Sequence, residues 1–339
     1  MRRLPDPSFW AGKKVLVTGH SGFVGGWTVL WLEQLGAEVL GLGLRPDEEP
    51  SLYELAGVAA SAASQFIDIS DRSKVATLLE MCELDIVLHL AAVSHVGQRG
   101  AAPRAFTTNV MGAVNLLDCL ARQPRLKAVL VVTSPEVYGP SASPLDAMGE
   151  DHPLAAADLQ SASRAASELI VAGYRESTFR PAGVQLGTAR GGSIIGGGDF
   201  GRPDWSGPPT LIRPWQHVLD SVAGYLVYLE SLADEPAAPP ALNFGPAPGT
   251  SPTTAAALAE IIGYGMLAGW TAASASAGAE PVRSLWLDTR LARDAIGFES
   301  RLAPHEAAEW TAQWQRAVAG GTSARTAILD QIAAYAALP

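Results

Sequence analysis

Three glycines spaced three residues apart follow the first apolar segment of the chain, in the run Thr18-Gly19-His20-Ser21-Gly22-Phe23-Val24-Gly25. Residues 14–18 before the run have the apolar pattern of a buried strand, and residues 27–35 after it have that of a helix. At such a junction Gly19 permits the tight turn, Gly22 lets the backbone approach an anion, and Gly25 allows close packing of helix on strand. This order predicts a dinucleotide-binding unit; a structural turn without a ligand is the alternative.

Short apolar runs continue to alternate with helical stretches along the chain. Strands are expected at 38–42, 66–69, 85–90, 128–133, 184–186 and 242–244, and helices at 71–82, 103–122, 159–174, 253–266, 305–318 and 324–337. Because the strands are apolar throughout and helices separate them, they predict a parallel sheet that is covered on both faces. The expected fold class is α/β, a Rossmann-type doubly wound parallel sheet with a small mixed C-terminal substrate lobe.

The second half of the chain changes in character, beginning with Gly- and Pro-rich residues 191–209. A length of 339 residues is enough for about two domains. We expect a Rossmann domain over 1–190, to which 211–246 returns. The substrate lobe is expected to consist of 191–210 and 247–339.

Composition excludes several classes of protein. With 48% hydrophobic and 17% charged residues the chain can bury a core, which excludes a disordered protein. A net charge of -10 argues against a nucleic-acid partner, whose binding surfaces are basic. The two cysteines, Cys82 and Cys119, give neither a disulfide scaffold nor a zinc spacing, and no other metal site emerges. Without an apolar signal segment or a membrane-spanning run, we expect a cytoplasmic protein with no membrane partner.

The glycine spacing and three further segments together resemble the extended branch of the short-chain dehydrogenase/reductase family. Asp68-Ile69 fits the acidic position near the adenine, Leu90-Ala91-Ala92-Val93 fits the alanine motif along the cofactor, and Asn109 fits a helix asparagine. The resemblance implies NAD or NADP as cofactor. It assigns the binding residues Gly19, Gly22, Phe23, Val24, Gly25, Asp68, Ile69, Ala91 and Ala92.

Longer runs resemble one group within that family, the CDP-glucose 4,6-dehydratases. They include Pro50-Ser51-Leu52-Tyr53-Glu54, Ile195-Gly196-Gly197-Gly198-Asp199-Phe200 and Ile212-Arg213-Pro214-Trp215-Gln216-His217-Val218. In that group the arginine matching Arg213 contacts a nucleotide diphosphate, which suits a guanidinium. The resemblance implies a nucleotide-activated sugar near Arg213 and Trp215, with His95 also at the cleft. A purely structural role stays open for each of the three.

The chain departs from this family where the chemistry is expected. In the relatives a tyrosine takes the proton of the sugar C4 hydroxyl while hydride passes to NAD, and a lysine four residues later lowers the tyrosine pKa. Here Gln160 stands for the tyrosine and Arg164 for the lysine. A carboxamide has no accessible pKa, so Gln160 is excluded as the base, whereas the permanently charged Arg164 can still hold the cofactor ribose.

The loop after the fifth expected strand, Thr133-Ser134-Pro135-Glu136, is altered as well. Ser134 keeps a hydroxyl group and Pro135 replaces an acid, so one proton donor is lost. Glu136 remains as a candidate base, or else as a capping or surface carboxylate. The expected catalytic set is Glu136 as base, Ser134 and Gln160 as positioning groups, and Arg164 beside the cofactor.

Two further departures affect the ligands. Arg45 lies at the end of the second strand, where the relatives carry an acid; an arginine favours the 2′-phosphate of NADP, while Asp47 leaves NAD open. The stretch 200–211 is much shorter than in the relatives, so a CDP-sugar would bind differently or not at all.

Three hypotheses of function stay open. The first is an enzyme that modifies a nucleotide-activated sugar by changed chemistry. The second is a dinucleotide-binding sensor or partner subunit without catalysis, and the third is a 4,6-dehydratase with a substitute base, for which Tyr138 and His95 are the first candidates. The resemblance also implies a homodimer that pairs through helices 103–122 and 159–174.

Overall fold

The computed structural model describes residues 2–47, 49–93, 101–139, 147–200, 212–235, 237–263 and 285–339. Within these residues the core is a seven-stranded sheet in the order β10-β6-β5-β4-β1-β2-β3, with every neighbouring pair parallel. The strands are β1 (Lys14–Thr18), β2 (Glu38–Gly43), β3 (Ala63–Phe66), β4 (Ile86–His89), β5 (Ala128–Thr133), β6 (Gln185–Gly191) and β10 (Ala241–Phe244).

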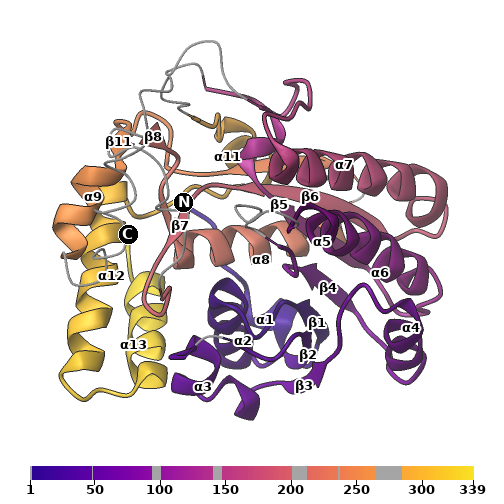
Figure 1. Ribbon diagram of the computed structural model, residues 1–339, viewed down its shortest axis with the longest axis horizontal. Helices are drawn as coiled ribbons and strands as arrows, with labels where there is room; N and C mark the ends of the chain where they lie inside the picture. The colour runs from indigo at the N-terminus through magenta and orange to yellow at the C-terminus, as the bar shows by residue number, and fades with distance from the viewer. Residues whose placement is uncertain are drawn as a thin grey trace.

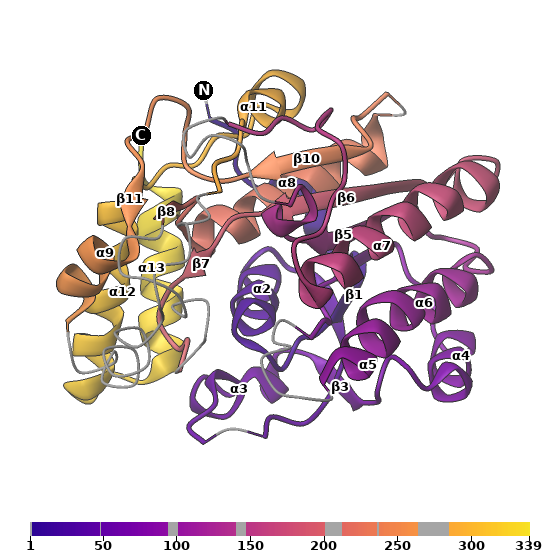
Figure 2. The same cartoon turned by 45° about the horizontal axis from the view of Figure 1, so that its top comes forward.

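Helices cover both faces of this sheet (Figure 1, Figure 2). On one face lie α2 (Phe23–Gln34) and α8 (Val218–Asp234), and on the other lie α4 (Arg72–Glu80), α6 (Gly112–Leu120) and α7 (Leu159–Tyr174). The expected α/β fold with a doubly wound parallel sheet is therefore confirmed.

Neighbouring residues of a strand pack into the two hydrophobic cores on opposite faces of the sheet. Val15 and Val17 of β1 join the cluster with the apolar side chains of α2 and α8, whereas Leu16 between them joins the cluster of α4, α6 and α7. All three are fully buried. Because both faces of the central strands are covered, β1, β4 and β5 are apolar at most positions, which is the pattern seen in the sequence.

The helix α8 was not among the expected helices, and two of the expected elements differ in detail from their expected form. The helix expected at 103–122 runs through α5 (Ala101–Ala105), a π-helical segment η2 (Phe106–Met111) and α6. The strand expected at 66–69 lies three residues earlier, as β3, because Ala63–Phe66 pair with β2. Ile69 is buried in the second core after the strand has ended, so its apolar character reflects packing and not pairing.

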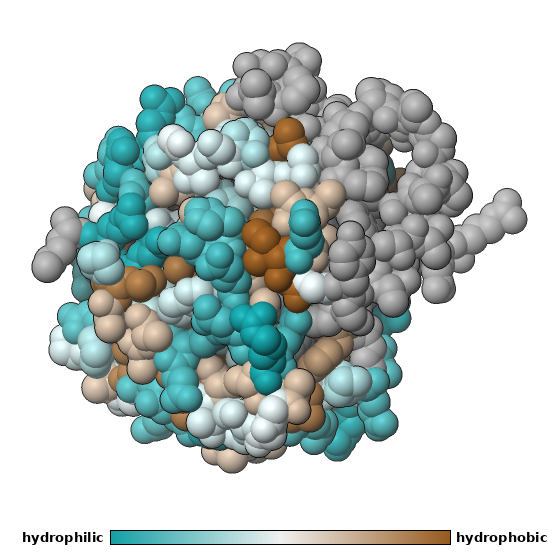
Figure 3. Space-filling model, turned by 90° about the vertical axis from the view of Figure 1, so that its left-hand side faces the viewer, coloured by the Kyte–Doolittle hydropathy of each residue, from teal (hydrophilic) through white to brown (hydrophobic). Residues whose placement is uncertain are grey.

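Three C-terminal helices, α9 (Ala255–Ile262), α12 (Pro304–Ala319) and α13 (Ala324–Ala336), stand beside the sheet (Figure 1). Ile328 and Tyr335 of α13 share a buried cluster with Trp31 of α2. The face on this side mixes hydrophilic and hydrophobic residues (Figure 3), as solvated surfaces do. The expected boundaries between a Rossmann domain and a substrate lobe stay a prediction.

Short elements complete the described chain: α1 (Pro7–Trp10), α3 (Leu52–Leu55), η1 (Val58–Ala60), η3 (Pro135–Val137), η4 (Arg175–Phe179), β7 (Ile194–Ile195), β8 (Ile212–Arg213), β9 (Gln216–His217), β11 (Thr253–Thr254) and α11 (Arg290–Ile296). None of the helices in the described ranges is long and apolar enough to cross a bilayer.

Candidate functional site

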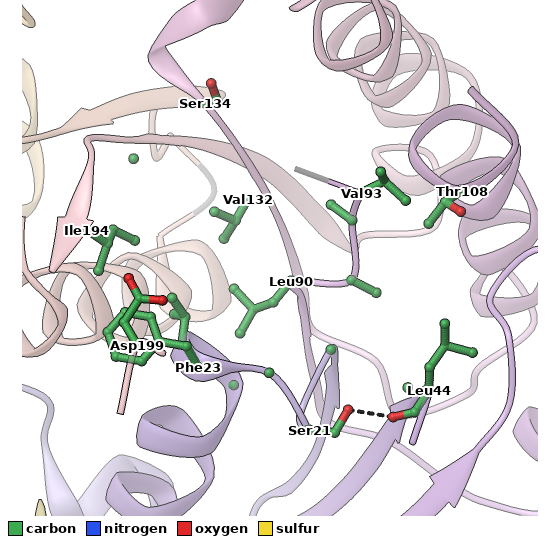
Figure 4. A pocket seen from close by; sticks show the side chains of 18 of the residues that line it. Ser21, Phe23, Leu44, Leu90, Val93, Thr108, Val132, Ser134, Ile194 and Asp199 are labelled. Atoms are coloured by element: carbon green, nitrogen blue, oxygen red, sulfur yellow. Dashed lines mark hydrogen bonds between the residues drawn. The ribbon is translucent and has the colours of Figure 1, made fainter. Parts of the chain in front are cut away.

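A cleft of about 440 Å³ opens at the carboxyl ends of the sheet strands, where open α/β sheets bind ligands (Figure 4). It brings together residues from both halves of the chain. Of the candidate cofactor, catalytic and substrate residues, those that line it are Gly19, Gly22, Phe23, Val24, Gly25, Arg45, Asp68, Ile69, Ala91, Ala92, Ser134, Glu136, Gln160, Arg164 and Arg213.

The three glycines of the turn meet different constraints. Gly19 has a φ of 72°, and a Cβ there would lie 2.9 Å from the backbone nitrogen of Ala91. A Cβ at Gly25 would lie 2.1 Å from the carbonyl oxygen of Gly19. The fold itself therefore requires glycine at both positions. At Gly22 the nearest atom would be 3.4 Å from a Cβ, so the protein leaves room there and a closely approaching ligand would explain the glycine.

The turn is fixed to the neighbouring strand by one buried hydroxyl group. Oγ1 of Thr18, at the end of β1, accepts hydrogen bonds from the amides of Leu90 (3.1 Å) and Ala91 (3.0 Å). It also lies 2.6 Å from Nδ1 of His89. Burial lowers the pKa of His89 to about 4, so the ring is neutral and carries no charge into this part of the site.

A second group of residues lines the far end of the cleft, beyond β2. Oγ of Ser21 donates to the carbonyl oxygen of Leu44 at 2.7 Å (Figure 4). The Arg45 guanidinium lies 4.3 Å from the centre of the Phe66 ring, a cation–π contact that holds the side chain over β3. Asp68 accepts from both the amide and the hydroxyl of Ser70, so its carboxylate orders the turn before α4.

These features fit the dinucleotide that the turn implies. The amides of the first turn of α2 have no partner within the helix, and with the helix dipole they favour a pyrophosphate beside Gly22. Arg45 and Asp68 lie where the adenosine half would extend. Arg164 lines the same cleft toward its opposite end, next to β5.

At that other end, Glu136 lies between two side chains from distant parts of the chain. Nε2 of Gln160, on the first turn of α7, donates to Oε2 of Glu136 at 3.4 Å. Nη1 of Arg213, on β8, lies 3.3 Å from Oε1 in an ion pair. Oγ of Ser134 accepts from the Glu136 amide at 3.1 Å and caps η3. The structure thus joins three of the expected catalytic residues with the expected substrate arginine.

Arg164 follows Gln160 by one helical turn and is half-buried. Its Nη1 donates to the carbonyl oxygen of Val132 on β5 at 3.5 Å. The guanidinium therefore lies beside the strand that carries the Ser134 loop, with its charge inside the cleft. It can hold an anionic or hydroxyl-bearing ligand there, but it cannot exchange a proton at neutral pH.

Tyr138 is engaged elsewhere and does not line the cleft. Its hydroxyl group donates to Asn243 at 2.7 Å and accepts from Nη1 of Arg190 at 2.7 Å. Burial raises the pKa of Tyr138 to about 12, so it is a poor candidate for a base. This observation weakens the hypothesis of an ordinary dehydratase with Tyr138 as its substitute base.

Of the other expected site residues, Trp215 does not line the cleft. Trp215 is fully buried in a cluster with Leu258 and Ala307, so the structure gives it a packing role at the base of the C-terminal helices. His95 lies outside the described residues, as does most of the stretch 200–211.

The cleft also includes Arg104, Thr108 and Tyr225, which the sequence did not mark as site residues, and Asp199, which appeared there only as part of a longer run. Asp199 follows the three glycines of the run that resembles the dehydratases, and Figure 4 shows its carboxyl group at the wall of the cleft. Arg104 and Thr108 lie on a helix that the sequence did predict, but no motif marked the face that they share with the cleft. No cluster of three or more potential metal ligands occurs in the described parts of the chain.

Residues 15–194 match the sequence pattern of the NAD dependent epimerase/dehydratase family. A CDP-glucose 4,6-dehydratase of Salmonella typhimurium is 36% identical over 263 residues, which are 71% of this chain and 73% of that protein.

Solved structures share the fold at lower identity. A dTDP-glucose 4,6-dehydratase from Bacillus anthracis in complex with NAD has a TM-score of 0.70 at 18% identity, over 90% of this chain and 97% of that one. A UDP-glucose 4-epimerase from Thermotoga maritima with UDP-glucose has a TM-score of 0.73 at 18% identity, over 90% and 99%.

Proposed function

The chain belongs to the NAD dependent epimerase/dehydratase family, as its motifs predicted, and from this premise we propose that it modifies a nucleotide-activated sugar by a reaction other than the family's usual C4 oxidation. The dinucleotide, NAD or NADP, would bind against the Gly19–Gly25 turn. The sugar nucleotide would bind at the end of the cleft that holds Glu136 and Arg213.

One observation carries this proposal. At the first turn of α7, where a phenol would be needed next to the sugar, the cleft presents Gln160 bound to Glu136. We refer to the end of the cleft with Ser134, Glu136, Gln160 and Arg213 as the corner. A carboxamide donates and accepts hydrogen bonds but cannot take a proton, so the proton acceptor of the corner is a carboxylate in place of a phenolate. The Gly19–Gly25 turn beside it keeps the three glycines that support dinucleotide binding.

Separate residues of the chain would bind the diphosphate, orient the sugar and accept its proton. Arg213 would hold the diphosphate, Gln160 and Ser134 would orient sugar hydroxyls, and Glu136 would accept a proton from the sugar. A bound nicotinamide supplies the ability to take up or return hydride. Arg164 would hold the ribose of the dinucleotide at the level of β5.

A second candidate function is a dinucleotide-binding sensor or partner subunit that performs no reaction. The Glu136–Arg213 ion pair favours it, because the guanidinium already occupies the carboxylate that a reaction would need. In this case binding of the dinucleotide would be retained and turnover would be absent.

The finer properties of the ligand and the assembly are part of the proposal. Arg45, exposed and stacked on Phe66, favours NADP over NAD because the guanidinium can pair with a 2′-phosphate. The exposed apolar side chains Met111, Leu159 and Leu169 on η2 and α7 support a homodimer through these helices.

The test is a titration of purified protein with NAD, NADP and CDP-glucose by calorimetry, followed by product analysis by NMR. We expect both kinds of ligand to bind, NADP more tightly than NAD, and no 4-keto-6-deoxy sugar to form. A sugar changed in another way supports the enzyme, an unchanged sugar supports the sensor, and a 4-keto-6-deoxy product contradicts the proposed reaction. Absence of dinucleotide binding contradicts both, and tighter binding of NAD contradicts the role given to Arg45.

A further inference from the structure

The Arg213 guanidinium is only partly used by the protein. One of its N–H groups reaches Glu136, over a long distance of 3.3 Å. Its Nε is buried and has no hydrogen-bond partner among the described residues. A guanidinium offers five N–H donors in a planar fork that matches two oxygens of a phosphate or carboxylate. The site therefore has donors to spare for an anion that approaches from the cleft.

Glu136 occupies the same place as that anion would. Its backbone is fixed by Pro135 and by the bond from its amide to Ser134, so the carboxylate stays at the corner between α7 and β8. Its second partner, Gln160, is neutral. The side chains of Glu136 and Arg213 are 24% and 18% exposed, so the pair is partly shielded from water and is held more firmly than a surface pair.

We propose that Glu136 closes the empty substrate site by occupying Arg213, and that the diphosphate of an incoming sugar nucleotide displaces it and thereby frees the carboxylate to act as a base. This inference rests on the proposed function and adds that substrate binding regulates the base. The ion pair is an internal competitor: it keeps the base inactive until the correct anion has bound.

The competition has a definite direction. A diphosphate carries two charges and can bind the fork through two oxygens, whereas Glu136 uses one long contact, so the ligand prevails. It does so at a reduced affinity, because the pair of Glu136 and Arg213 must be broken before the diphosphate can bind. Removing the Glu136 charge therefore tightens binding, which is the opposite of what loss of a structural or ligand-holding group would do.

The test is the affinity of CDP-glucose, measured by calorimetry at saturating NAD for wild type, Glu136→Gln, Arg213→Gln and the double variant. We expect Glu136→Gln to bind CDP-glucose about ten-fold more tightly than wild type. Arg213→Gln should bind it more weakly, and adding Glu136→Gln to that variant should bring no gain. The matched control is Glu176→Gln, which removes the acid of a surface pair with Arg180 and should leave the affinity unchanged.

The outcomes distinguish a failure of the internal competition from a failure of the proposed function. If wild type binds CDP-glucose and Glu136→Gln binds it equally or less well, the internal competition is refuted and the proposed function stands. A gain that persists in the Arg213→Gln background also refutes it, because the gain would not act through Arg213. If NAD binds but no variant binds CDP-glucose, both the competition and the sugar-nucleotide proposal are wrong. Thermal melts of each variant show whether a weakened affinity reflects unfolding.

Discussion

Glu168 of α7 and Arg190 of β6 form a buried ion pair one hydrogen bond away from the cleft. Nε and Nη2 of Arg190 lie 3.0 and 3.2 Å from the two carboxylate oxygens. Thr133, which lines the cleft, donates to the same carboxylate at 2.6 Å, and Thr188 donates to it at 3.0 Å. The pair therefore fixes α7, with Gln160 on it, against the two strands that frame the candidate catalytic corner.

This network predicts a large stability effect. Glu168→Gln leaves the buried Arg190 without a counter-charge, and breaking a buried pair from one side costs about 3–5 kcal/mol. Chemical denaturation should show this loss in the free energy of unfolding. Glu176→Gln, in the exposed pair with Arg180, is the control and should change little. An equal effect in both variants would contradict the role of the buried pair.

The glycine turn gives a prediction about ligand binding. Gly22→Val should abolish dinucleotide binding while the protein stays folded, because a Cβ there meets no atom closer than 3.4 Å and the backbone is extended. Gly25→Ala should instead unfold or strain the protein, since its Cβ would lie 2.1 Å from a backbone oxygen. Calorimetry with NAD and thermal melts check the two variants. Retained NAD affinity in a folded Gly22→Val would show that the ligand does not approach this turn.

The sequence predicted those parts of the molecule that local pattern encodes. The turn at Gly19–Gly25 was recognised because its glycine spacing, preceding strand and following helix are contiguous. The parallel sheet followed from apolar strands that alternate with helices. The position of β3 was missed by three residues, because the burial of Ile69 against the second core has the same apolar signature as strand pairing.

The geometry of the corner could not be predicted in this way. The ion pair of Glu136 and Arg213 joins residues that are 77 positions apart, and no local pattern specifies that contact. The engagement of Tyr138 by Asn243, 105 positions away, is of the same kind. Trp215 was assigned to the substrate from its neighbours in the sequence, but its indole points into the packing of the C-terminal helices.

The proposed homodimer gives a prediction about assembly. Leu169 on α7 is 65% exposed, and Met111 on η2 and Leu159 on α7 are exposed as well, so the proposed interface would cover all three. Leu169→Glu should therefore produce a monomer in light scattering at micromolar concentration. Met81→Glu, at the end of α4, is the control, because Met81 is 81% exposed on a different element. A wild-type monomer under the same conditions would refute the dimer.

A buried acid predicts the pH dependence of stability. Burial raises the pKa of Asp220 to about 7, although it accepts hydrogen bonds from the Tyr335 hydroxyl and the Arg301 amide, both at 2.6 Å. Since the unfolded value is 3.8, the folded state binds the proton more tightly. The stabilisation from this group is therefore complete below the unfolded pKa and is lost as the pH rises through the folded one.

The measurement is the melting temperature between about pH 4 and about pH 7. Asp220→Asn keeps the two acceptor bonds and removes the charge, so the melting temperature of this variant should lose the part of its pH dependence that wild type owes to Asp220. Asp294→Asn, an exposed acid paired with Arg293, should keep the wild-type profile. If Asp220→Asn follows the wild-type profile, Asp220 is not the responsible group.

The last prediction concerns the chemistry of the corner. Gln160 and Arg164 both lie on the cleft side of α7, so Gln160→Tyr with Arg164→Lys should fold normally and place a titratable phenol beside Glu136. General-base catalysis is worth about 10²–10⁴-fold, so this double variant should transfer hydride from CDP-glucose to NAD, seen as the absorbance of the reduced cofactor. The control is Gln160→Phe with Arg164→Lys, which has the ring without the hydroxyl group and should show no such absorbance. Because Pro135 still lacks an acidic side chain, neither variant should release the 4-keto-6-deoxy sugar at appreciable rates. If wild type itself forms that sugar from CDP-glucose, the proposal that the usual C4 oxidation is lost with the tyrosine is wrong. Glu136→Gln and a replacement of His95 would then show which of the two residues supplies the base in place of Gln160.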